Sequence, residues 1–76
     1  MANLNDLAKG ETGRVAGVND KTLIGRRLME MGIVPGVSIR VVKSGPFDDP
    51  IEIRLLGYSL AIRRSEAAAV EIESEI

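Results

Sequence analysis

Glycine and proline divide this chain of 76 residues into short apolar runs, and that division limits which folds it can form. Three runs alternate apolar and polar residues, as strands with one buried face do: residues 37–42, 51–56 and 59–63. A fourth alternating run covers residues 70–73, and an extended segment covers 14–18. The pattern predicts about five antiparallel strands. So few strands cannot form two full sheets, but they can close a small barrel without exposed edges.

One segment, residues 21–31, has helical periodicity instead. Its apolar side chains share one face at spacings of four and three: Ile24, Leu28 and Met31. Arg26 and Glu30 lie on the opposite face, where they can form a weak ion pair. This segment is therefore expected to be the one substantial helix, packed on the barrel by its apolar face.

Turn residues predict where this helix begins and ends. Asn19-Asp20 is the expected N-cap, Gly32 is the expected left-handed residue after the helix, and Pro35 prevents the helix from resuming. Two single helical turns are also predicted: residues 6–8 after an Asn5 cap and residues 66–68 after a Ser65 cap.

The predicted core contains the inward apolar residues of these elements: Leu7, Val15, Ile24, Leu28, Met31, Ile39, Val41, Ile53, Leu55, Leu60, Ile62, Val70 and Ile72. Leu4 is also expected to face inward. Val42 and Leu56 occupy the outward phase of their strands. They either pack under the helix or a loop, or form an interaction patch with Tyr58 and Phe47.

Cysteine and histidine are both absent, which excludes most enzyme chemistry. Ser-His-Asp triads, cysteine nucleophiles, histidine-zinc sites and acid–base catalysis by imidazole all require one of these residue types. No catalytic residue and no cofactor is expected.

The charge balance argues against nucleic acid as the main partner. The net charge is −1 and the isoelectric point is about 5.3. Residues 1–65 carry ten basic and seven acidic side chains, whereas residues 66–76 carry four glutamates and no base. Nucleic-acid binders of this size are normally basic and often carry stacking aromatic residues. Arg40, Arg54 and Arg63 occupy outward strand positions and could form a modest basic stripe for anionic groups, RNA included.

The start of the chain lacks the basic and apolar regions of a secretory signal, and no stretch approaches the ~20 apolar residues that span a bilayer. We therefore expect a cytoplasmic location without membrane insertion.

Three stretches in order resemble the FeoA family, ferrous iron transport protein A. The first, residues 27–36, contains the pattern L-x-x-M-G-I-x-P-G. The second is the loop at 45–51 with its two prolines, and the third is Leu60-Ala61-Ile62-Arg63. The resemblance covers the chain from Leu4 to about Ile72. One departure is Asp48, which stands where the family usually has a glycine free to adopt positive φ.

The resemblance implies one domain over residues 1–76, an SH3-like β-barrel with an inserted short helix. It also implies an accessory, non-catalytic role in bacterial ferrous iron uptake, beside the membrane GTPase FeoB. Through that partner the protein could be peripheral to the inner membrane. A homologous barrel is the C-terminal domain of iron-dependent DtxR-type repressors. Two aromatic residues cannot build the groove with which SH3 domains bind proline-rich peptides.

We expect the helix and its following turn to contact the GTPase, because a plain five-stranded barrel lacks them. The candidate partner-binding residues are Leu23, Arg26, Met29, Gly32, Ile33, Pro35 and Gly36. Met29 falls away from the helix's apolar face, so it either contacts a partner or is covered by loops.

Two other functions remain open. Arg26 or Arg27 could act as an arginine finger that accelerates the partner's GTP hydrolysis, although surface arginines are ordinary in small domains. Alternatively, the chain is a free-standing regulatory barrel that binds a peptide or a metal. It has no helix-turn-helix with which to read DNA itself.

Two groups of acidic residues are weak metal-site candidates. Asp48 and Asp49 could hold a hard cation loosely, but Asp and Pro also favour exposed turns. Glu71, Glu73 and Glu75 are expected to be a solvated strand edge. Selective Fe²⁺ sites generally use imidazole or several converging carboxylates. No metal site is predicted, and the oligomeric state stays open.

Overall fold

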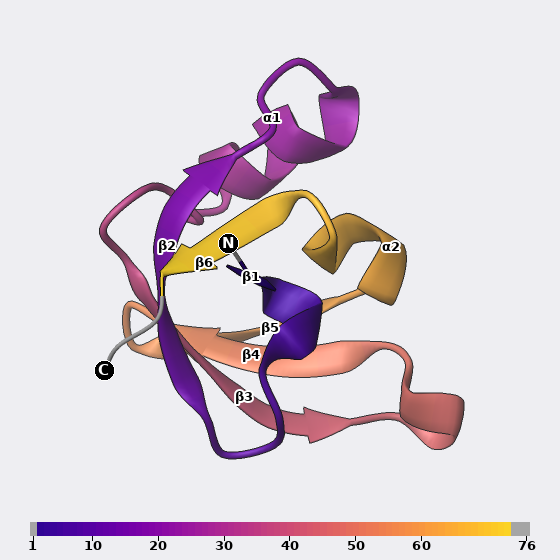
Figure 1. Cartoon of the computed structure of the whole chain (residues 1–76). Coiled ribbons are helices and arrows are strands. Elements are labelled where there is room, and N and C mark those ends of the chain that lie inside the picture. The colour runs from indigo at the N-terminus through magenta and orange to yellow at the C-terminus, as the bar shows by residue number, and fades with distance from the viewer. Residues whose placement is uncertain (1, 74–76) are drawn as a thin grey trace.

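The alternating apolar residues form six strands of one antiparallel sheet, in the order β1-β6-β2-β3-β4-β5. The computed structural model describes residues 2–73. Figure 1 shows the sheet curling around the core, with α1 packed at one end. Along the chain the elements are β1 Ala2–Asn3, η1 Leu4–Asp6, β2 Thr12–Val18, α1 Leu23–Glu30, β3 Ser38–Ser44, η2 Pro46–Asp48, β4 Ile51–Leu55, β5 Tyr58–Ile62, α2 Arg64–Ala67 and β6 Val70–Glu73.

The predicted meander is confirmed: β2 pairs with β3, β3 with β4, and β4 with β5. β6 returns to lie between β2 and β1. The sequence did not predict β1, because two residues are too few to show an alternating pattern. Since β1 covers the outer side of β6, Glu71 and Glu73 are exposed but do not lie on an edge strand. The predicted solvent exposure of both glutamates is confirmed, whereas the predicted edge is wrong for Glu71, which pairs with Asn3. Glu75 lies outside the described residues.

A two-residue turn sets the register of β4 and β5. Leu56 and Gly57 have φ values of 50° and 83°, both left-handed, between the paired residues Leu55 and Tyr58. Turns with two left-handed residues match the twist of a hairpin, and glycine at the second position removes the steric cost there.

Within residues 2–73, thirteen apolar side chains are buried: Leu4, Val15, Leu28, Ile33, Ile39, Val41, Ile51, Ile53, Leu55, Ile62, Ala67, Val70 and Ile72. Leu7, Met31 and Leu60 are half-buried and pack against this core. Ile24 was expected inside and is 40% exposed. Most of the predicted core is confirmed, and the error at Ile24 comes from how α1 approaches the sheet.

α1 packs closely against the backbone of Asn19 through a glycine, Gly25. The Thr22 hydroxyl accepts a hydrogen bond from the Gly25 N–H at 3.0 Å and caps the helix, so the cap predicted at Asn19-Asp20 is wrong. Gly25 and Leu28 are the buried residues of α1. A Cβ at Gly25 would lie 1.7 Å from the carbonyl oxygen of Asn19. Because the helix packs on the Gly25–Leu28 side, Ile24 turns outward.

The end of α1 forms a Schellman motif. Gly32 has φ 101°, as predicted, and its N–H bonds to the carbonyl of Met29. The Ile33 N–H bonds back to the Leu28 carbonyl at 3.0 Å. This motif commonly brings the residue after the glycine against the helix. Ile33 and Leu28 are accordingly both fully buried.

Both short helical turns are capped two residues earlier than predicted. Asn3 caps η1, since its side chain accepts from the Asn5 N–H at 2.8 Å, and Asp6 accepts from the Asn3 N–H at 2.9 Å. At α2 the Glu66 carboxylate accepts from the Arg63 N–H at 2.8 Å. The caps predicted at Asn5 and Ser65 are therefore wrong.

Candidate partner-binding surface

The candidate surface lies on α1 and the turn after it. Leu23 is 76% exposed at the start of the helix, and Arg26 is exposed one turn later. Met29 is half-buried, so it is neither fully covered by loops nor fully exposed to a partner. A shallow groove of 510 Å³ is lined by Asp20, Lys21, Arg26, Met29 and Glu30. We call Leu23 and the exposed or half-buried residues of this groove the α1 surface.

The structure does not bring all the candidate residues to that surface. Ile33 has no exposed area, because it packs under the end of α1. Gly32 is half-buried there, while Pro35 and Gly36 are exposed in the turn that leads to β3. The Gly36 N–H donates to the Val15 carbonyl at 2.8 Å, which fixes this turn against β2. Ile33 therefore positions the surface rather than touching a partner.

Arg26 is held by the segment before the helix. Its Nε donates to the Asp20 carbonyl at 3.1 Å. The predicted pair of Arg26 with Glu30 does not form among the described residues. Arg27 is exposed and has no side-chain hydrogen bond or ion pair within residues 2–73.

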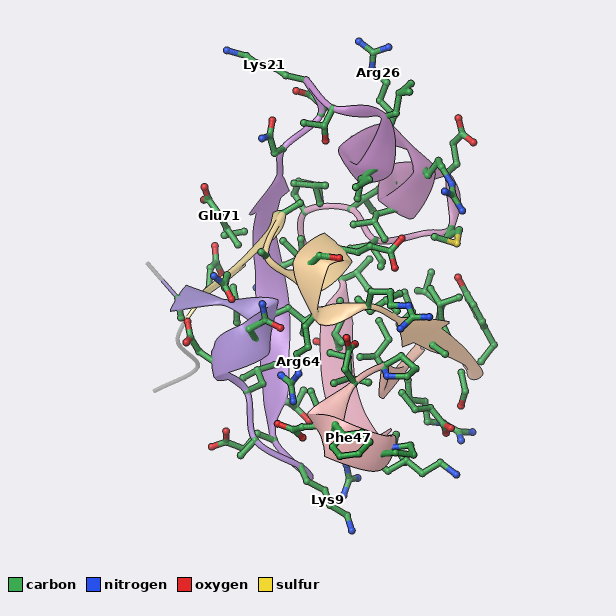
Figure 2. All side chains as sticks on the ribbon, turned by 90° about the vertical axis from the view of Figure 1, so that its right-hand side faces the viewer. Lys9, Lys21, Arg26, Phe47, Arg64 and Glu71 are labelled. Carbon is green, nitrogen blue, oxygen red and sulfur yellow. The ribbon has the colours of Figure 1, made fainter. Side chains whose placement is uncertain are left out.

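Leu56 and Tyr58 extend the apolar area at the end of α1. Leu56 is 67% exposed and Tyr58 is 40% exposed. The Tyr58 hydroxyl donates to the Met31 carbonyl, and a Cβ on Gly32 would lie 3.0 Å from Leu56 Cδ1. Val42 is half-buried. Phe47 does not join them, since Figure 2 places it at the opposite end of the molecule from α1.

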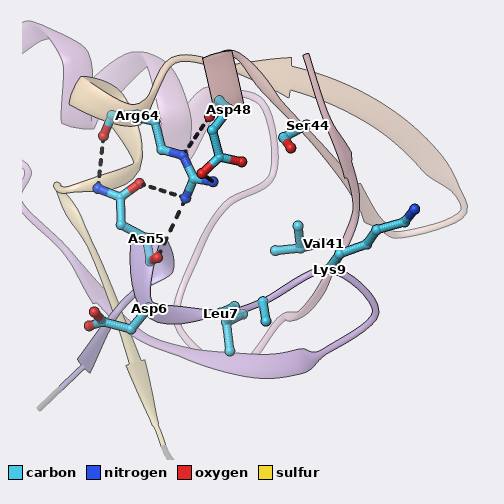
Figure 3. Close-up of a pocket in the computed structure, with 9 residues that line it drawn as sticks. Asn5, Asp6, Leu7, Lys9, Val41, Ser44, Asp48 and Arg64 are labelled. Atoms are coloured by element: carbon cyan, nitrogen blue, oxygen red, sulfur yellow. Dashed lines mark hydrogen bonds and ion pairs between the residues drawn. The ribbon is translucent and has the colours of Figure 1, made fainter. Parts of the chain in front are cut away.

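A second concave site, of 370 Å³, lies at that opposite end, between η1 and the loop that holds η2 (Figure 3). Arg64 is its central residue. The Arg64 Nε donates to the Asp48 carbonyl at 2.9 Å, and its Nη2 lies 3.0 Å from Asp48 Oδ2. Its Nη1 lies 3.4 Å from the carbonyl and side-chain oxygens of Asn5, whose amide donates back to the Arg64 carbonyl at 3.0 Å. We call this set the Arg64 network, which no pattern in the sequence predicted.

Asp48 and Asp49 both serve this network. Asp49 Oδ1 accepts from the Arg64 N–H at 3.0 Å. Hydrogen bonding from the Ser44 side chain and, next, the positive charge of Arg64 lower the pKa of Asp48. Asp48 has φ 67°, so it adopts the left-handed conformation that the family's usual glycine would adopt freely. Among residues 2–73 no three acidic, histidine or cysteine side chains gather as a metal site would need.

The predicted basic stripe forms only in part. Arg40 lies directly opposite Arg54 across β3 and β4, and both are exposed. Arg63 follows the far end of β5, where it does not join them in register. Glu52, which lies on β4 with Arg54, forms an ion pair with Lys43 at 3.7 Å.

A family model decides the classification: the FeoA domain matches residues 2–74. The chain belongs to the FeoA family. The FeoA-like protein of Clostridium acetobutylicum has the same fold, with a TM-score of 0.90 and 36% identity over 97% of this chain and 86% of that one. FeoA of Stenotrophomonas maltophilia, an SH3 domain protein solved with zinc, gives a TM-score of 0.85 and 30% identity over 96% and 91% of the two chains. The predicted SH3-like fold is thereby confirmed.

A curated relative joins this kind of domain to a transporter. The Fe(2+) transport protein A/Fe(2+) transporter FeoB fusion protein of Porphyromonas gingivalis is 34% identical over 70 residues. The match covers 92% of this chain and 8% of the fusion protein. In that relative an FeoA domain and an FeoB transporter are thus parts of one chain. Within residues 2–73 of the present chain, no helix has the length and apolar character needed to cross a bilayer.

Proposed function

We propose that this FeoA-family domain is a non-catalytic accessory protein of ferrous iron transport that binds and modulates an FeoB-type membrane GTPase. The fusion relative carries the proposal, because covalent linkage keeps two interacting domains at high effective concentration. The absence of histidine and cysteine agrees with a role in binding rather than in chemistry. The protein would act in the cytoplasm and reach the membrane through its partner.

The α1 surface is the proposed contact. It combines an exposed leucine, Leu23, with a groove lined by Met29 and by charged residues such as Arg26 and Glu30. An apolar centre rimmed by charges is typical of a transient protein interface. Leu56 and Tyr58 continue the apolar area past the end of the helix.

An ¹⁵N-HSQC titration with the soluble cytoplasmic domain of the GTPase, with and without a GTP analogue, tests this contact. Shifts confined to α1 and residues 32–36 are expected. Met29→Asp should weaken binding about tenfold or more, or about 1.4 kcal/mol, by charging the centre of the groove. Phe47→Asp, a control at the opposite end, should bind as the original chain does. Equal binding by both variants would refute the assignment of the α1 surface.

A second candidate function rests on Arg27, whose exposed side chain forms no hydrogen bond or ion pair with the described residues. As an arginine finger it would stabilise charge in the transition state of the partner's GTP hydrolysis. Adding the domain should then raise GTP turnover by at least about a thousandfold, and Arg27→Ala should abolish the gain. Turnover unchanged by the domain would remove this candidate and leave the binding role intact.

A further inference from the structure

β5 forms an open edge of the sheet, so the strands of residues 2–73 do not close without exposed edges as the sequence predicted. It pairs with β4 on one side, and no strand of residues 2–73 pairs with it on the other. Opposing residues of an antiparallel pair alternate between those that exchange hydrogen bonds and those that do not, counted from the hairpin turn. The pairs Leu55–Tyr58 and Ile53–Leu60 are bonded, so the backbone groups of Ser59 and Ala61 point away from β4. No other group in the described chain bonds to them.

This edge lacks the features that usually prevent an edge strand from pairing with another strand. Edge strands are commonly protected by charged residues, proline, a bulge or short length. β5 runs for five residues, Tyr58–Ile62, with no charge, no proline and a regular register along β4. Ser59 and Ala61 are small and exposed, so an incoming backbone can approach them. β1 at the other edge is two residues long and continues directly into η1.

Unneutralised positive charge lies beside the open edge. Arg40, Arg54 and Ser59 form one outward-facing row across β3, β4 and β5. Neither arginine side chain forms a hydrogen bond or an ion pair with any described residue. Like charges directly opposite each other destabilise a sheet. A negative group supplied from outside the chain would remove that cost.

An added strand would place such a group within reach. Its residue opposite Ser59 would lie in the same row as Arg54, about 10 Å away across the small serine. Extended arginine and glutamate side chains can together cover that separation. The next row carries no unpaired positive charge, because Glu52 is paired with Lys43 at 3.7 Å, so the acidic residue opposite Ser59 is the one that supplies the charge selectivity.

The other face of the edge favours apolar residues. Leu60 is half-buried and Tyr58 is 40% exposed on that face. Residues of an added strand alternate between the two faces, so acidic and apolar positions would alternate along it. Apolar side chains beside Leu60 and Tyr58 would remove both from water.

We propose that the β5 edge binds an extended segment of a protein partner as an additional antiparallel or parallel strand, with acidic residues toward Arg54 and apolar residues toward Leu60. Main-chain hydrogen bonds to Ser59 and Ala61 supply affinity, and the alternating side chains supply selectivity. This edge adjoins the proposed GTPase contact at Tyr58, but its contacts at Ser59, Ala61 and Arg54 lie outside the α1 surface, and the proposal does not depend on the GTPase contact.

A blocked heptapeptide of alternating glutamate and valine is the probe, added to the ¹⁵N-labelled chain. We expect the amide signals of Ser59 and Ala61 to shift and their hydrogen exchange to slow at least tenfold, with α1 unchanged. The same peptide with lysine in place of glutamate should bind at least tenfold more weakly. A glutamate peptide N-methylated at alternate amides facing the edge should not bind.

Two variants with matched controls separate the backbone and charge contributions. Ala61→Pro removes the edge amide but no bond to β4, and should abolish binding, whereas Ala61→Ser should retain it. Arg54→Glu should reverse the preference to the lysine peptide, and Arg63→Glu should not. If Ala61→Pro fails to fold, the N-methylated peptide decides the backbone contribution.

Three results would overturn the proposal. The first is the absence of shifts at Ser59 and Ala61 at millimolar peptide. The second is equal binding of the glutamate and lysine peptides. The third is protection of both amides that rises with protein concentration in the absence of peptide, since a second copy of the chain would then occupy the edge.

Discussion

The α1 end of the molecule and the Arg64 network at the opposite end both hold irregular segments against the sheet, but by different contacts (Figure 2). At α1 the contacts are steric and apolar: Gly25 packs on the backbone of Asn19, and Leu28 and Ile33 are fully buried. At the opposite end the contacts are polar, and one arginine binds residues 59 and 16 positions away in the chain.

The α1 end is therefore stabilised by close packing, and the opposite end by ion pairing and hydrogen bonds. The α1 contact excludes water and depends on close fit, so a single added methyl group disturbs it. The Arg64 network is partly in solvent: the side chain of Arg64 is 28% exposed and that of Asp48 is 72% exposed. Solvent screens such a pair, and its loss costs less.

The largest effect is expected for Gly25→Ala. The new Cβ would lie 1.7 Å from the Asn19 carbonyl oxygen and 2.6 Å from its carbon, both backbone atoms that cannot move independently. The helix would have to shift away from the sheet, at a cost of about 3 kcal/mol in the free energy of unfolding. Urea unfolding followed by circular dichroism measures this loss.

Gly17→Ala is the matched control for that measurement. Gly17 lies in β2, its φ is not positive, and the nearest atom to a Cβ there is 3.9 Å away. The same methyl group should therefore change the free energy of unfolding by less than about 0.5 kcal/mol. Similar losses in both variants would show that glycine flexibility, rather than the close approach at α1, sets the stability.

The same contrast explains what the sequence could predict. Alternation and helical spacing predicted the five longer strands, α1 and most of the core, because burial of an apolar face leaves a periodic pattern. The prediction of a buried Ile24 failed because α1 packs through Gly25 and Leu28. A glycine has no apolar side chain, so it adds nothing to the periodic pattern from which burial was predicted. Ile33 was recoverable, since the predicted left-handed Gly32 implies a Schellman motif that buries the next residue.

The Arg64 network left no comparable signal. Asn5 and Arg64 are 59 residues apart and meet only because η1 lies beside α2 in the folded chain. A polar contact between distant segments has no period along the sequence. The FeoA resemblance predicted the SH3-like fold correctly, but it does not assign this network or the open edge of β5.

Arg64→Ala should have an intermediate effect. The variant loses the ion pair with Asp48 and the hydrogen bonds to Asn5 and to the Asp48 carbonyl. We expect a loss of about 1 kcal/mol in the free energy of unfolding, since each group that loses a partner remains partly hydrated. Chemical shifts should change in η1 and η2 and stay constant in α1.

Lys43→Ala provides the matched control for charge. The Lys43–Glu52 pair is longer, at 3.7 Å, and the lysine side chain is 67% exposed. Its removal should cost less than about 0.5 kcal/mol. Equal losses for the two variants would mean that the Arg64 network contributes no more than an ordinary surface ion pair.

The smallest effect concerns pH and the carboxyl group of Asp48. Hydrogen bonding from the Ser44 side chain, followed by the charge of Arg64, lowers the pKa of this carboxyl in the folded chain. Because this pKa is lower in the folded chain than in the unfolded chain, the ionised carboxyl group stabilises the folded state at pH values above the unfolded-state pKa. That contribution disappears as the pH falls through the lower, folded-state pKa. Side-chain carboxyl NMR across the acid range measures the titration directly.

Ser44→Ala and Arg64→Ala should each raise the pKa of Asp48 toward its ordinary value, because the hydrogen bond from Ser44 is the largest single cause of the lowered pKa and Arg64 contributes both its charge and a hydrogen bond. Neither change should alter the chemical shifts of α1 at any pH. A pKa left unchanged by Ser44→Ala but raised by Arg64→Ala would identify Arg64 as the main stabiliser of the carboxylate. Charge rather than hydrogen bonding would then organise the polar end of the molecule, and its contrast with the α1 end would become sharper.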